Sequence, residues 1–349
     1  MHTKSILDIT IIGGGPAGLF AAFYSGLREM STKIIEYQPF LGGKVHIYPE
    51  KMIWDIGGLT PVTGAQLIEQ MINQGLTFNP EVVLGEKVTS ISQEDDGIFT
   101  LQTASGQNHY SKAVILAVGG GIINPTKLNI EGAERFEVNN LHYTVKSLAR
   151  FKGKRVLISG GGNAAIDWAN ELESIAEKVY LTYRKDNLKG HEAEVTRLLE
   201  SSVDCLFNTT IEKLVAATDH DTIDQVVLKK EDGQELTLQV DEVIINHGYE
   251  RDKDLIANSE VNIKMFDDYC LDGTALSETS VPGIFAAGDI LYHEGKVHLI
   301  AGAFHDAANA VNRAKVYISP DARAYGMVSS HNDLFTEKNR ELKQHLYAK

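Results

Sequence analysis

Two glycine-rich turns of the same kind constrain the fold of this chain more than any other feature of its 349 residues. The first turn, GGGPAG at residues 13–18, follows the β-branched run DITII and leads through the helical pattern LFAAFYSGLRE into a second apolar strand, TKIIEY. The second turn, GGGNAA at residues 160–165, is surrounded by the same order of strand, turn, helix and strand. This order is typical of a mononucleotide-binding βαβ unit. The sequence therefore predicts an α/β protein with two Rossmann-like domains.

The first turn has the spacing of a pyrophosphate-binding loop. Gly13 permits a tight turn, Gly15 lets the backbone approach a pyrophosphate, and Gly18 lets the helix and the strand pack closely. The N-terminus of the helix then faces the anion. Glu36, at the end of the second strand, is placed to accept hydrogen bonds from an adenosine ribose and to repel a 2'-phosphate. We therefore expect FAD or NAD here; the alternative is a structural glycine turn with a surface glutamate.

The second turn is followed by positive charge instead. Tyr183, Arg184 and Lys185 follow its second strand where an acidic residue would otherwise stand, and Lys189 comes a few residues later. Positive charge at this position suits the extra phosphate of NADP(H). The alternative interpretation is a solvated basic turn.

A third segment indicates which nucleotide is the flavin. The run SVPGIFAAGDI is a short apolar strand that ends in small residues, so a planar ligand can lie close to Gly288, and Asp289 can bond a ribityl hydroxyl. The helical pattern LIAGAFHDAANAVNRAKVYI follows, and the N-terminus of such a helix would stabilise negative charge on the pyrimidine edge of a reduced flavin. Taken alone, Asp289 could also be a simple turn aspartate. Because two dinucleotide sites imply electron transfer between two nucleotides, we expect FAD at the first turn and NADP(H) at the second.

The order of these segments predicts the domain organisation. The flavin segments lie at both ends of the chain, and the second turn lies between two apolar strands that close with glycine, AVILAVGGG and EVIINHGY. We expect three-layer ββα domains of the FAD/NAD(P)-binding kind, with the NADP domain inserted into the FAD domain. The predicted FAD-binding domain is 1–118 plus 248–330, the NADP(H)-binding domain is 119–247 and a C-terminal helical tail is 331–349. The alternating runs GIFTLQTA and VVLKKEDGQELTLQV predict antiparallel hairpins beside each core.

Composition narrows the possible partners. A formal net charge of -14 argues against nucleic acid or an anionic membrane as the main partner. No apolar run approaches the roughly 18 residues needed to span a bilayer. Cys205 and Cys270 are far apart in sequence, so they suggest neither a disulfide framework nor a thiolate metal site. We expect a cytoplasmic protein with no metal.

With IIGGGPAGLFAAFYSGL, ISGGGNAAIDWANEL, YRKDNLKGHE and GIFAAGDI in this order, the chain resembles the thioredoxin-reductase family of flavoproteins over nearly its whole length. Members of that family carry a C-x-x-C dithiol shortly before the NADP turn, where this chain has YTVKS at residues 143–147. Without a thiol pair, electrons cannot pass to a disulfide by thiolate exchange. The chain, including GGKVHIYPEKMIWDIGG, is similar to the cysteine-free branch of this fold, the thioredoxin-reductase-like ferredoxin/flavodoxin-NADP(+) reductases.

The resemblance implies particular site residues. Tyr48 is expected to stack on one face of the flavin, and the branch usually places a histidine over the other face, where this chain has Val328. Valine can neither stack as an imidazole does nor exchange a proton, and His331 is a poor substitute. The tail helix would then cover the second flavin face or a dimer partner. The FAD contacts that the resemblance implies, including those of the first turn, are Gly13, Gly15, Ala17, Gly18, Glu36, Lys44, Tyr48, Val88, Ile123, Asp289 and Ser330. The implied NADP contacts are Gly160, Gly162, Asn163, Ala164, Ala165, Arg184, Lys185 and Lys189.

The function that follows from the resemblance is FAD-dependent electron exchange between NADP(H) and ferredoxin or flavodoxin, in a homodimer. Hydride passes between NADPH and N5 of FAD, and single electrons pass between FAD and the carrier, so no catalytic acid or base beyond the flavin is expected. Two alternatives stay open. One is an NAD(P)H oxidase or diaphorase-like flavoenzyme that reduces oxygen, quinones or ferric chelates, which Val328 would favour by opening the flavin face. The other is a non-catalytic, nucleotide-sensing protein.

Overall fold

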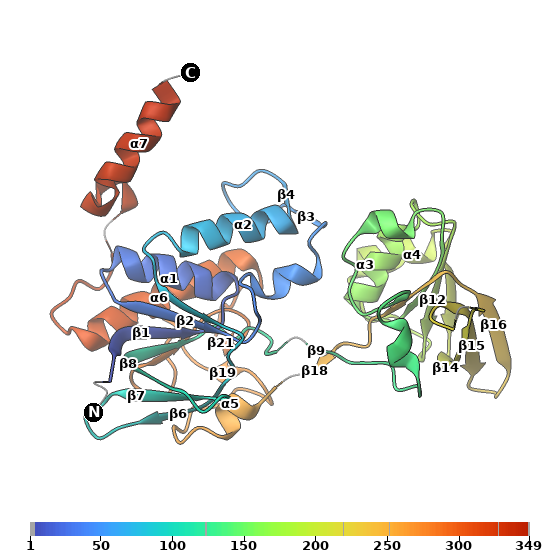
Figure 1. Ribbon diagram of the computed structural model, residues 1–349, viewed down its shortest axis with the longest axis horizontal. Helices are drawn as coiled ribbons and strands as arrows, with labels where there is room; N and C mark the ends of the chain where they lie inside the picture. Colours follow the sequence, from blue (N-terminus) through green and yellow to red (C-terminus); the bar gives the residue numbers. More distant parts are fainter. Residues whose placement is uncertain (1–3, 123, 219, 251, 327, 348–349) are drawn as a thin grey trace. The chain divides into compact units, whose positions relative to one another are not determined.

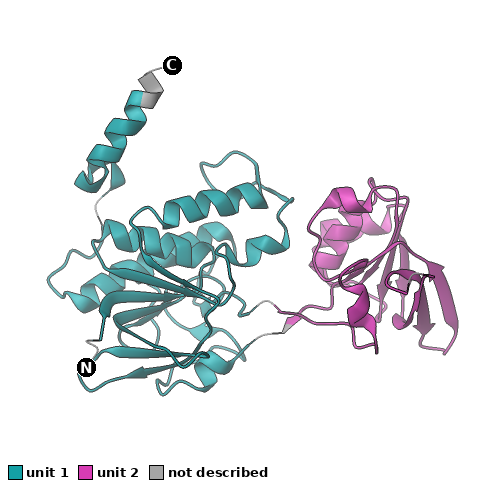
Figure 2. Ribbon diagram, in the orientation of Figure 1, with its two compact units in different colours: residues 1–122, 251–349 teal, residues 123–250 magenta. Residues whose placement is uncertain are grey.

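The computed structural model describes every residue except 1–3, 123, 219, 251, 327 and 348–349. Contacts within the chain divide it into two compact units, which Figure 2 shows in different colours. Unit 1 comprises residues 1–122 and 251–349, and unit 2 comprises residues 123–250.

Unit 1 is built on one central sheet. Its strand order is β5-β2-β1-β8-β7-β6, with β20 also paired to β8. Strands β5, β2, β1, β8 and β20 are parallel, and β8, β7 and β6 form an antiparallel meander, which confirms the predicted hairpin in this region. The strands are β1 (Ile6–Ile12), β2 (Thr32–Glu36), β5 (Glu81–Leu84), β6 (Val88–Gln93), β7 (Phe99–Thr103), β8 (Asn108–Leu116) and β20 (Ile284–Ala286).

The two halves of β8 have different partners on the same edge. Its first half pairs with β7, where Phe99 lies opposite Ser111, and its second half pairs with β20, where Ile284 lies opposite Val114. The chain therefore brings the C-terminal flavin segment into the N-terminal sheet beside the strand that leads out of unit 1.

Three long helices cover one face of this sheet, as Figure 1 shows. They are α1 (Pro16–Leu27), α2 (Gly64–Gly75) and α6 (Ile300–Ile318). The core between helices and sheet contains Ile9, Leu19 and Ile34, each at most 1% exposed, and alanines along α6 let that helix approach α1 closely. A second cluster, around the fully buried Phe99 and Leu101, fills the other face of the sheet.

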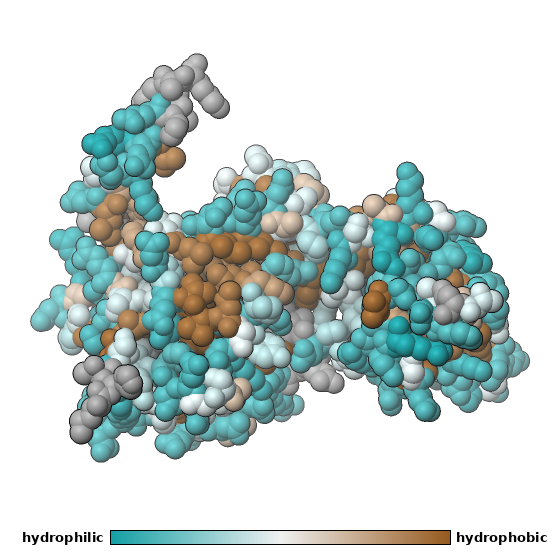
Figure 3. Space-filling model, in the orientation of Figure 1, coloured by the Kyte–Doolittle hydropathy of each residue, from teal (hydrophilic) through white to brown (hydrophobic). Residues whose placement is uncertain are grey.

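Aromatic side chains lie along the outer side of α1 and α6. Half-buried Phe20 contacts Phe23, with ring centroids 6.0 Å apart, and Phe304 on α6, with centroids 5.1 Å apart. Figure 3 shows hydrophobic residues gathered on one face of unit 1. We call Phe20, Phe23 and Phe304 the aromatic face of unit 1.

The C-terminal tail of unit 1 is helical, and Phe335 and Lys338 connect it to the rest of the unit. Phe335 lies against Phe23 and Phe78, with centroids 6.4 and 5.4 Å apart, and Lys338 Nζ donates a 3.0 Å hydrogen bond to the carbonyl of Thr77.

The remaining elements of unit 1 are η1 (Gly43–Ile47), β3 (Met52–Ile53), β4 (Val62–Thr63), α5 (Asp254–Ala257), β19 (Leu271–Asp272), β21 (Leu291–Tyr292), η4 (Ser329–His331), η5 (Asp333–Phe335) and α7 (Thr336–Tyr347).

Unit 2 repeats the layered plan on a smaller scale. A parallel sheet of order β10-β17-β11-β12-β13 carries two helices, and a three-stranded antiparallel sheet β14-β15-β16 packs beside it. Its elements are β9 (Asn124–Pro125), η2 (Ala133–Phe136), β10 (Leu141–His142), η3 (Leu148–Phe151), β11 (Arg155–Ser159), α3 (Asn163–Leu172), β12 (Lys178–Tyr183), α4 (Glu192–Leu199), β13 (Asp204–Phe207), β14 (Thr209–Ala216), β15 (Ile223–Lys230), β16 (Glu235–Gln239), β17 (Glu242–Ile245) and β18 (Tyr249–Glu250). The β15–β16 hairpin and the α/β class with two Rossmann-like parts were both predicted from the sequence and are confirmed.

A bidentate ion pair ties the start of β11 to the residue before β17. The guanidinium of Arg155 donates to both carboxylate oxygens of Asp241 at 3.1 and 2.8 Å, and the Arg155 backbone N–H donates to the same carboxylate at 2.7 Å. These bonds hold the pKa of Asp241 below its ordinary value. The carboxylate therefore contributes stability above the unfolded pKa of about 3.9, and that contribution is lost as the pH falls through the lower, folded pKa.

We predict that Asp241→Asn lowers the free energy of unfolding of unit 2 at pH 7 by about 1 to 2 kcal/mol, since it removes charge-assisted hydrogen bonds. The difference from the parent should shrink as the pH falls below about 4. Urea unfolding followed by the fluorescence of Trp168, which is 3% exposed in α3, measures both effects. The matched control is Glu212→Gln, which breaks an exposed pair with Lys229 and should change stability by less than about 0.5 kcal/mol. An equal loss at pH 7 and pH 3 would contradict this role for Asp241.

Candidate functional site

The first glycine turn has no room for side chains at two of its positions. Gly13 has φ +108°, and a Cβ there would lie 2.4 Å from the carbonyl oxygen of Ala117, which follows β8. A Cβ on Gly18 would lie 1.9 Å from the carbonyl oxygen of Gly13. At Gly15 a Cβ would meet only the Gly43 Cα, at 3.6 Å. The turn is thus tight where β1 meets α1 and open where a pyrophosphate would approach.

The N-terminus of α1 is available to an anion. Gly15 is the N-cap residue and has no side chain to cap the helix, and Pro16 begins the helix without an N–H group. The remaining first-turn N–H groups have no intrahelical partner, which is the arrangement that binds phosphate in dinucleotide folds.

Glu36 is held in place by the backbone around it. Its Oε2 accepts a 2.6 Å hydrogen bond from the Gly14 N–H, and its Oε1 accepts a 2.8 Å bond from the Gln38 N–H. A carboxylate has about four lone-pair positions, so two remain for ribose hydroxyls. The carboxylate is therefore oriented at the end of β2 with acceptor capacity left over.

Tyr48, predicted to stack on the flavin ring, and Asp289, predicted to bond the ribityl chain, are close enough for their charges to interact. Tyr48 is half-buried after η1, and Asp289 follows β20. Burial raises the pKa of the Tyr48 hydroxyl, and the negative charges of Asp289 and Asp55 raise it further. The segment after β2 and the segment after β20, more than two hundred residues apart, thus meet at the same place.

The other predicted FAD residues have varied surroundings. Ala17 is buried, and a Cβ on Gly288 would lie 3.2 Å from its Cβ. Lys44 is exposed on η1, whereas the side chain of Val88 is 5% exposed within the second core cluster, so only its backbone is left for a ligand. Ser330 is exposed in η4, and Val328, just before it, is 61% exposed. The prediction at Ile123 lies outside the described residues.

These features together fit FAD. Unit 1 offers a backbone cradle that a Cβ would fill, an uncapped helix N-terminus for the pyrophosphate and a fixed carboxylate for the ribose. It also offers a tyrosine after η1 and an aspartate after β20. Each of these groups matches the chemistry of one part of the cofactor.

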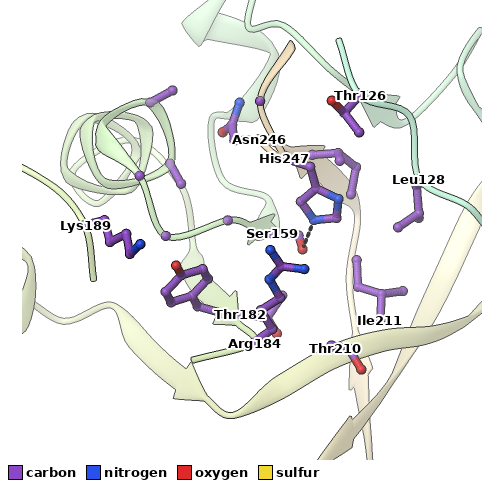
Figure 4. A pocket seen from close by; sticks show the side chains of 18 of the residues that line it. Thr126, Leu128, Ser159, Thr182, Arg184, Lys189, Thr210, Ile211, Asn246 and His247 are labelled. Carbon is purple, nitrogen blue, oxygen red and sulfur yellow. Dashed lines mark hydrogen bonds between the residues drawn. The ribbon is translucent and has the colours of Figure 1, made fainter. Parts of the chain in front are cut away.

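Unit 2 contains a pocket of about 780 Å³, shown in Figure 4. It lies at the carboxyl ends of the parallel strands, where ligands bind in open α/β sheets. All eight residues that the sequence predicted for NADP line this pocket: Gly160, Gly162, Asn163, Ala164, Ala165, Arg184, Lys185 and Lys189.

The second turn repeats the geometry of the first. Gly160 has φ +153°, and a Cβ there would lie 2.5 Å from the carbonyl oxygen of Asn246, while nothing lies within 4 Å of a Cβ on Gly162. Gly162 is also the N-cap of α3 and has no capping side chain. The basic loop is bonded to this turn, because the Lys189 N–H donates a 2.7 Å hydrogen bond to the Gly161 carbonyl.

Among the described residues that line the pocket, the acidic and basic side chains are all basic. Arg184, Lys185 and Lys189 line it, and none of the described lining residues is an aspartate or a glutamate. A site with three cations and no carboxylate favours a ligand with several phosphates. The residues therefore fit NADP(H), and they fit NADH less well.

Sequence reasoning missed several lining residues, of which His247 is the most informative. Its Nε2 lies 2.8 Å from the hydroxyl of Ser159, and its side chain points toward Arg184 in Figure 4. Partial burial of the ring, and then the positive charge of Arg184, lower the pKa of His247, which lies at the exposed rim of the pocket. The sequence placed this residue only in the run EVIINHGY, which closes an apolar strand with glycine. The available signal was that EVIIN is a parallel strand whose carboxyl end must lie beside the glycine turn.

Other missed residues come from the antiparallel sheet and the crossover segments. Tyr143, from the run that replaces the dithiol, lines the pocket, and its hydroxyl accepts a 3.1 Å hydrogen bond from the Leu128 N–H. The remaining newly identified lining residues include Thr126, Thr210, Ile211, Asn246 and Tyr249.

The chain is similar to known proteins over nearly its whole length. The model of the pyridine nucleotide-disulphide oxidoreductase family matches residues 7–314. The protein named Ferredoxin--NADP reductase 1 of Bacillus mycoides (strain KBAB4) is 65% identical over 343 residues, 98% of each chain, and the protein of the same name from Bacillus licheniformis is 62% identical over 349 residues, 100% of each chain. Thioredoxin reductase of Lactococcus lactis shares the fold with a TM-score of 0.73 at 24% identity, covering 90% of this chain and 99% of its own.

We predict that Gly18→Val yields protein with less than about a tenth of the parent's bound FAD, because a β-branched side chain at 1.9 Å from the Gly13 oxygen must push α1 away from β1. The ratio of flavin to protein absorbance measures this. The control is Gly57→Ala, where nothing lies within 4 Å of an added Cβ, and FAD content should not change. Full FAD content in Gly18→Val, with unaltered circular dichroism, would contradict the assignment of this turn.

Proposed function

The chain belongs to the pyridine nucleotide-disulphide oxidoreductase family, and from this premise we propose that it is an FAD-dependent ferredoxin–NADP(+) oxidoreductase. Its reaction is two reduced ferredoxins plus NADP+ and H+ giving two oxidised ferredoxins and NADPH. FAD, when bound, exchanges a hydride with NADPH at its N5 atom and single electrons with the carrier. The observation that carries the proposal is a pair of dinucleotide-binding turns, one in each unit, with no thiol pair beside the second.

Disulfide reduction is the activity that the missing thiols exclude. Residues 143–147 contain no cysteine, and neither Cys205 nor Cys270 is in a disulfide. Burial, and then the charge of Asp204, raise the pKa of the half-buried Cys205 thiol, so it is protonated and unreactive at neutral pH. Electrons would therefore leave the flavin directly, for a carrier protein in the proposed reaction.

We assign the FAD to unit 1 and the NADP(H) to unit 2. In unit 1 the N-terminus of α1 would hold the pyrophosphate, Glu36 the adenosine ribose, and Asp289 the ribityl chain, with Tyr48 against the ring. In unit 2 the N-terminus of α3 would hold the other pyrophosphate, and Arg184 and Lys185 the 2'-phosphate. The protein's task is to place the two rings in contact, which needs no further acid or base.

Three further assignments belong to the same proposal. Flavodoxin serves as an alternative carrier, the enzyme acts in the cytoplasm, and it works as a homodimer in which the aromatic face of unit 1 is covered. No helix in the described part of the chain is long and apolar enough to cross a membrane.

The half-buried rings of the aromatic face contact one another at the surface of unit 1, which favours a protein partner there. Sedimentation velocity of the FAD-loaded protein checks the dimer, and a purely monomeric species would overturn it.

We predict that the double variant Arg184→Gln with Lys185→Gln raises the KM for NADPH by about tenfold to a hundredfold, since it removes about 1.5 to 3 kcal/mol of charge-assisted hydrogen bonding to the 2'-phosphate. The KM for NADH should stay within about twofold, because NADH lacks that phosphate. The matched control is Lys213→Gln, an exposed lysine on β14 that does not line the pocket. Equal losses with both coenzymes would show that these cations do not read the 2'-phosphate.

The carrier is tested by following the flavin band and ferredoxin together. Under anaerobic conditions NADPH should bleach the flavin, and added oxidised ferredoxin or flavodoxin should restore it while becoming reduced. The KM for an acidic carrier should rise between about 50 and about 300 mM salt, because the attraction between exposed charges is screened. A flavin that is re-oxidised only by oxygen, quinones or ferric chelates would contradict the proposal and favour an oxidase, for which the exposed Val328 leaves access.

A further inference from the structure

A charged cluster is buried beneath the turn that follows β20. The side chains of Lys296 and Asp306 form an ion pair in which each is 3% exposed, and His293 beside them is 7% exposed. Asp306 lies on α6, and Lys296 lies in the segment between β21 and α6. The electron-transfer chemistry proposed above uses none of these three side chains.

Both backbone polar groups of Gly288 are bonded to this ion pair. The Gly288 N–H donates a 3.1 Å hydrogen bond to Oδ2 of Asp306, and Lys296 Nζ donates a 2.8 Å bond to the Gly288 carbonyl while also contacting the same Oδ2. Gly288 has φ +80°, a conformation that glycine tolerates and other residues rarely adopt. The ion pair thus closes a hydrogen-bonded ring through the backbone of one glycine residue and ties it to α6.

The second oxygen of Asp306 faces His293. The His293 Nδ1 lies 2.8 Å from the carbonyl oxygen of Glu294, and since a carbonyl only accepts, Nδ1 carries a proton. Its Nε2 is then the atom 3.5 Å from Oδ1 of Asp306. Two donors, the Gly288 N–H and Lys296, therefore hold Oδ2 of the buried carboxylate, while Oδ1 faces the His293 ring.

Stability alone does not explain such a cluster. Removing two charges from water costs several kcal/mol per ion, and well-packed apolar residues of the same size often replace a buried pair without loss of stability. What an apolar pair cannot do is bond the N–H and the carbonyl of one glycine at the same time. The arrangement therefore points to fixing the backbone next to Asp289.

The start of α6 is fixed by the same region. A Cβ on Gly302 would lie 2.1 Å from the carbonyl oxygen of Val297, so the first turn of α6 packs directly on the segment that carries Lys296. The helix N-terminus, the Gly288 turn and the ion pair form one rigid set of contacts. A displaced turn would move Asp289 and the positive end of the α6 dipole relative to each other.

We propose that Lys296 and Asp306 are positioning residues for the flavin, which hold the Gly288–Asp289 turn against the N-terminus of α6 and so determine FAD affinity and the balance between oxidised and reduced FAD. This rests on the assignment of FAD to unit 1. The pair acts through Gly288 rather than by direct contact with the cofactor, because both side chains are covered by protein.

The experiment titrates apoprotein with FAD and follows flavin fluorescence, for the parent and for Asp306→Asn, Lys296→Met and Asp306→Glu. We expect the Kd for FAD to rise at least about tenfold in the first two, and Asp306→Glu to recover part of the loss because it keeps the charge. The midpoint potential of bound FAD should also shift, by about 30 mV for each tenfold difference between the affinities for oxidised and reduced FAD. Thermal unfolding of each apoprotein separates loss of folding from loss of positioning.

The matched control is Arg313→Gln, which breaks the ion pair of α6 with Glu278, with an N–O distance of 2.6 Å, without contact to Gly288. Its FAD affinity and potential should equal those of the parent. If Asp306→Asn does not fold, Lys296→Met alone decides the question. Variants that lower the apoprotein melting temperature but keep the parent's Kd and potential would overturn the positioning role. Because the titration uses no carrier, failure to reduce ferredoxin would leave this result standing, whereas a parent that binds no FAD would overturn both proposals.

Discussion

The nucleotide sites of this protein depend on a contact between two backbones at the end of each parallel sheet. In unit 1 the first glycine of the turn lies against the carbonyl of Ala117, and in unit 2 it lies against the carbonyl of Asn246, so closely that a Cβ would be 2.4 or 2.5 Å from the oxygen. Ala117 and Asn246 each follow the strand that leads the chain toward the other unit, β8 in one case and β17 in the other. In each unit, the contact that shapes the glycine turn is therefore made by the residue at which the chain begins to leave the sheet for the other unit.

Once the two turns have the same backbone, the side chains beside them decide which nucleotide each prefers. In unit 1 the strand after the turn ends in Glu36, whose carboxylate is fixed by two N–H groups. In unit 2 the corresponding strand ends before Arg184 and Lys185, at a pocket with no acidic residue among the described lining residues. A carboxylate repels a 2'-phosphate and a guanidinium attracts it, so under the proposed function this difference in charge favours FAD at the first turn and NADP(H) at the second. Residues 143–147 contain no dithiol, so electron transfer to a disulfide through a thiol pair at this position is excluded.

The parts of this arrangement that the sequence predicts are those that a local pattern encodes. Glycine spacing, strand-helix periodicity and the sign of charge after a strand all lie within about thirty residues, which is the length of a βαβ unit. Contacts between distant segments leave no such pattern. His247 was predicted only as part of the run EVIINHGY, although it bonds Ser159 across the sheet. Val88 turns its side chain into the core, and the halves of β8 take partners from different ends of the chain. The ion pair of Lys296 and Asp306 was missed because neither residue belongs to a glycine motif, and only the folded turn brings both to Gly288.

The most direct test of two nucleotides in two separate units is hydrogen exchange of the FAD-loaded protein with and without NADP+. Slower exchange should appear in unit 2 at the turn of residues 160–165, at the basic loop of residues 184–189 and at residues 246–249, all of which line or adjoin one pocket. The turn of residues 13–18 should already be protected by FAD and should not change when NADP+ is added. Protection by NADP+ at residues 13–18, or none in unit 2, would contradict the assignment of one nucleotide to each unit.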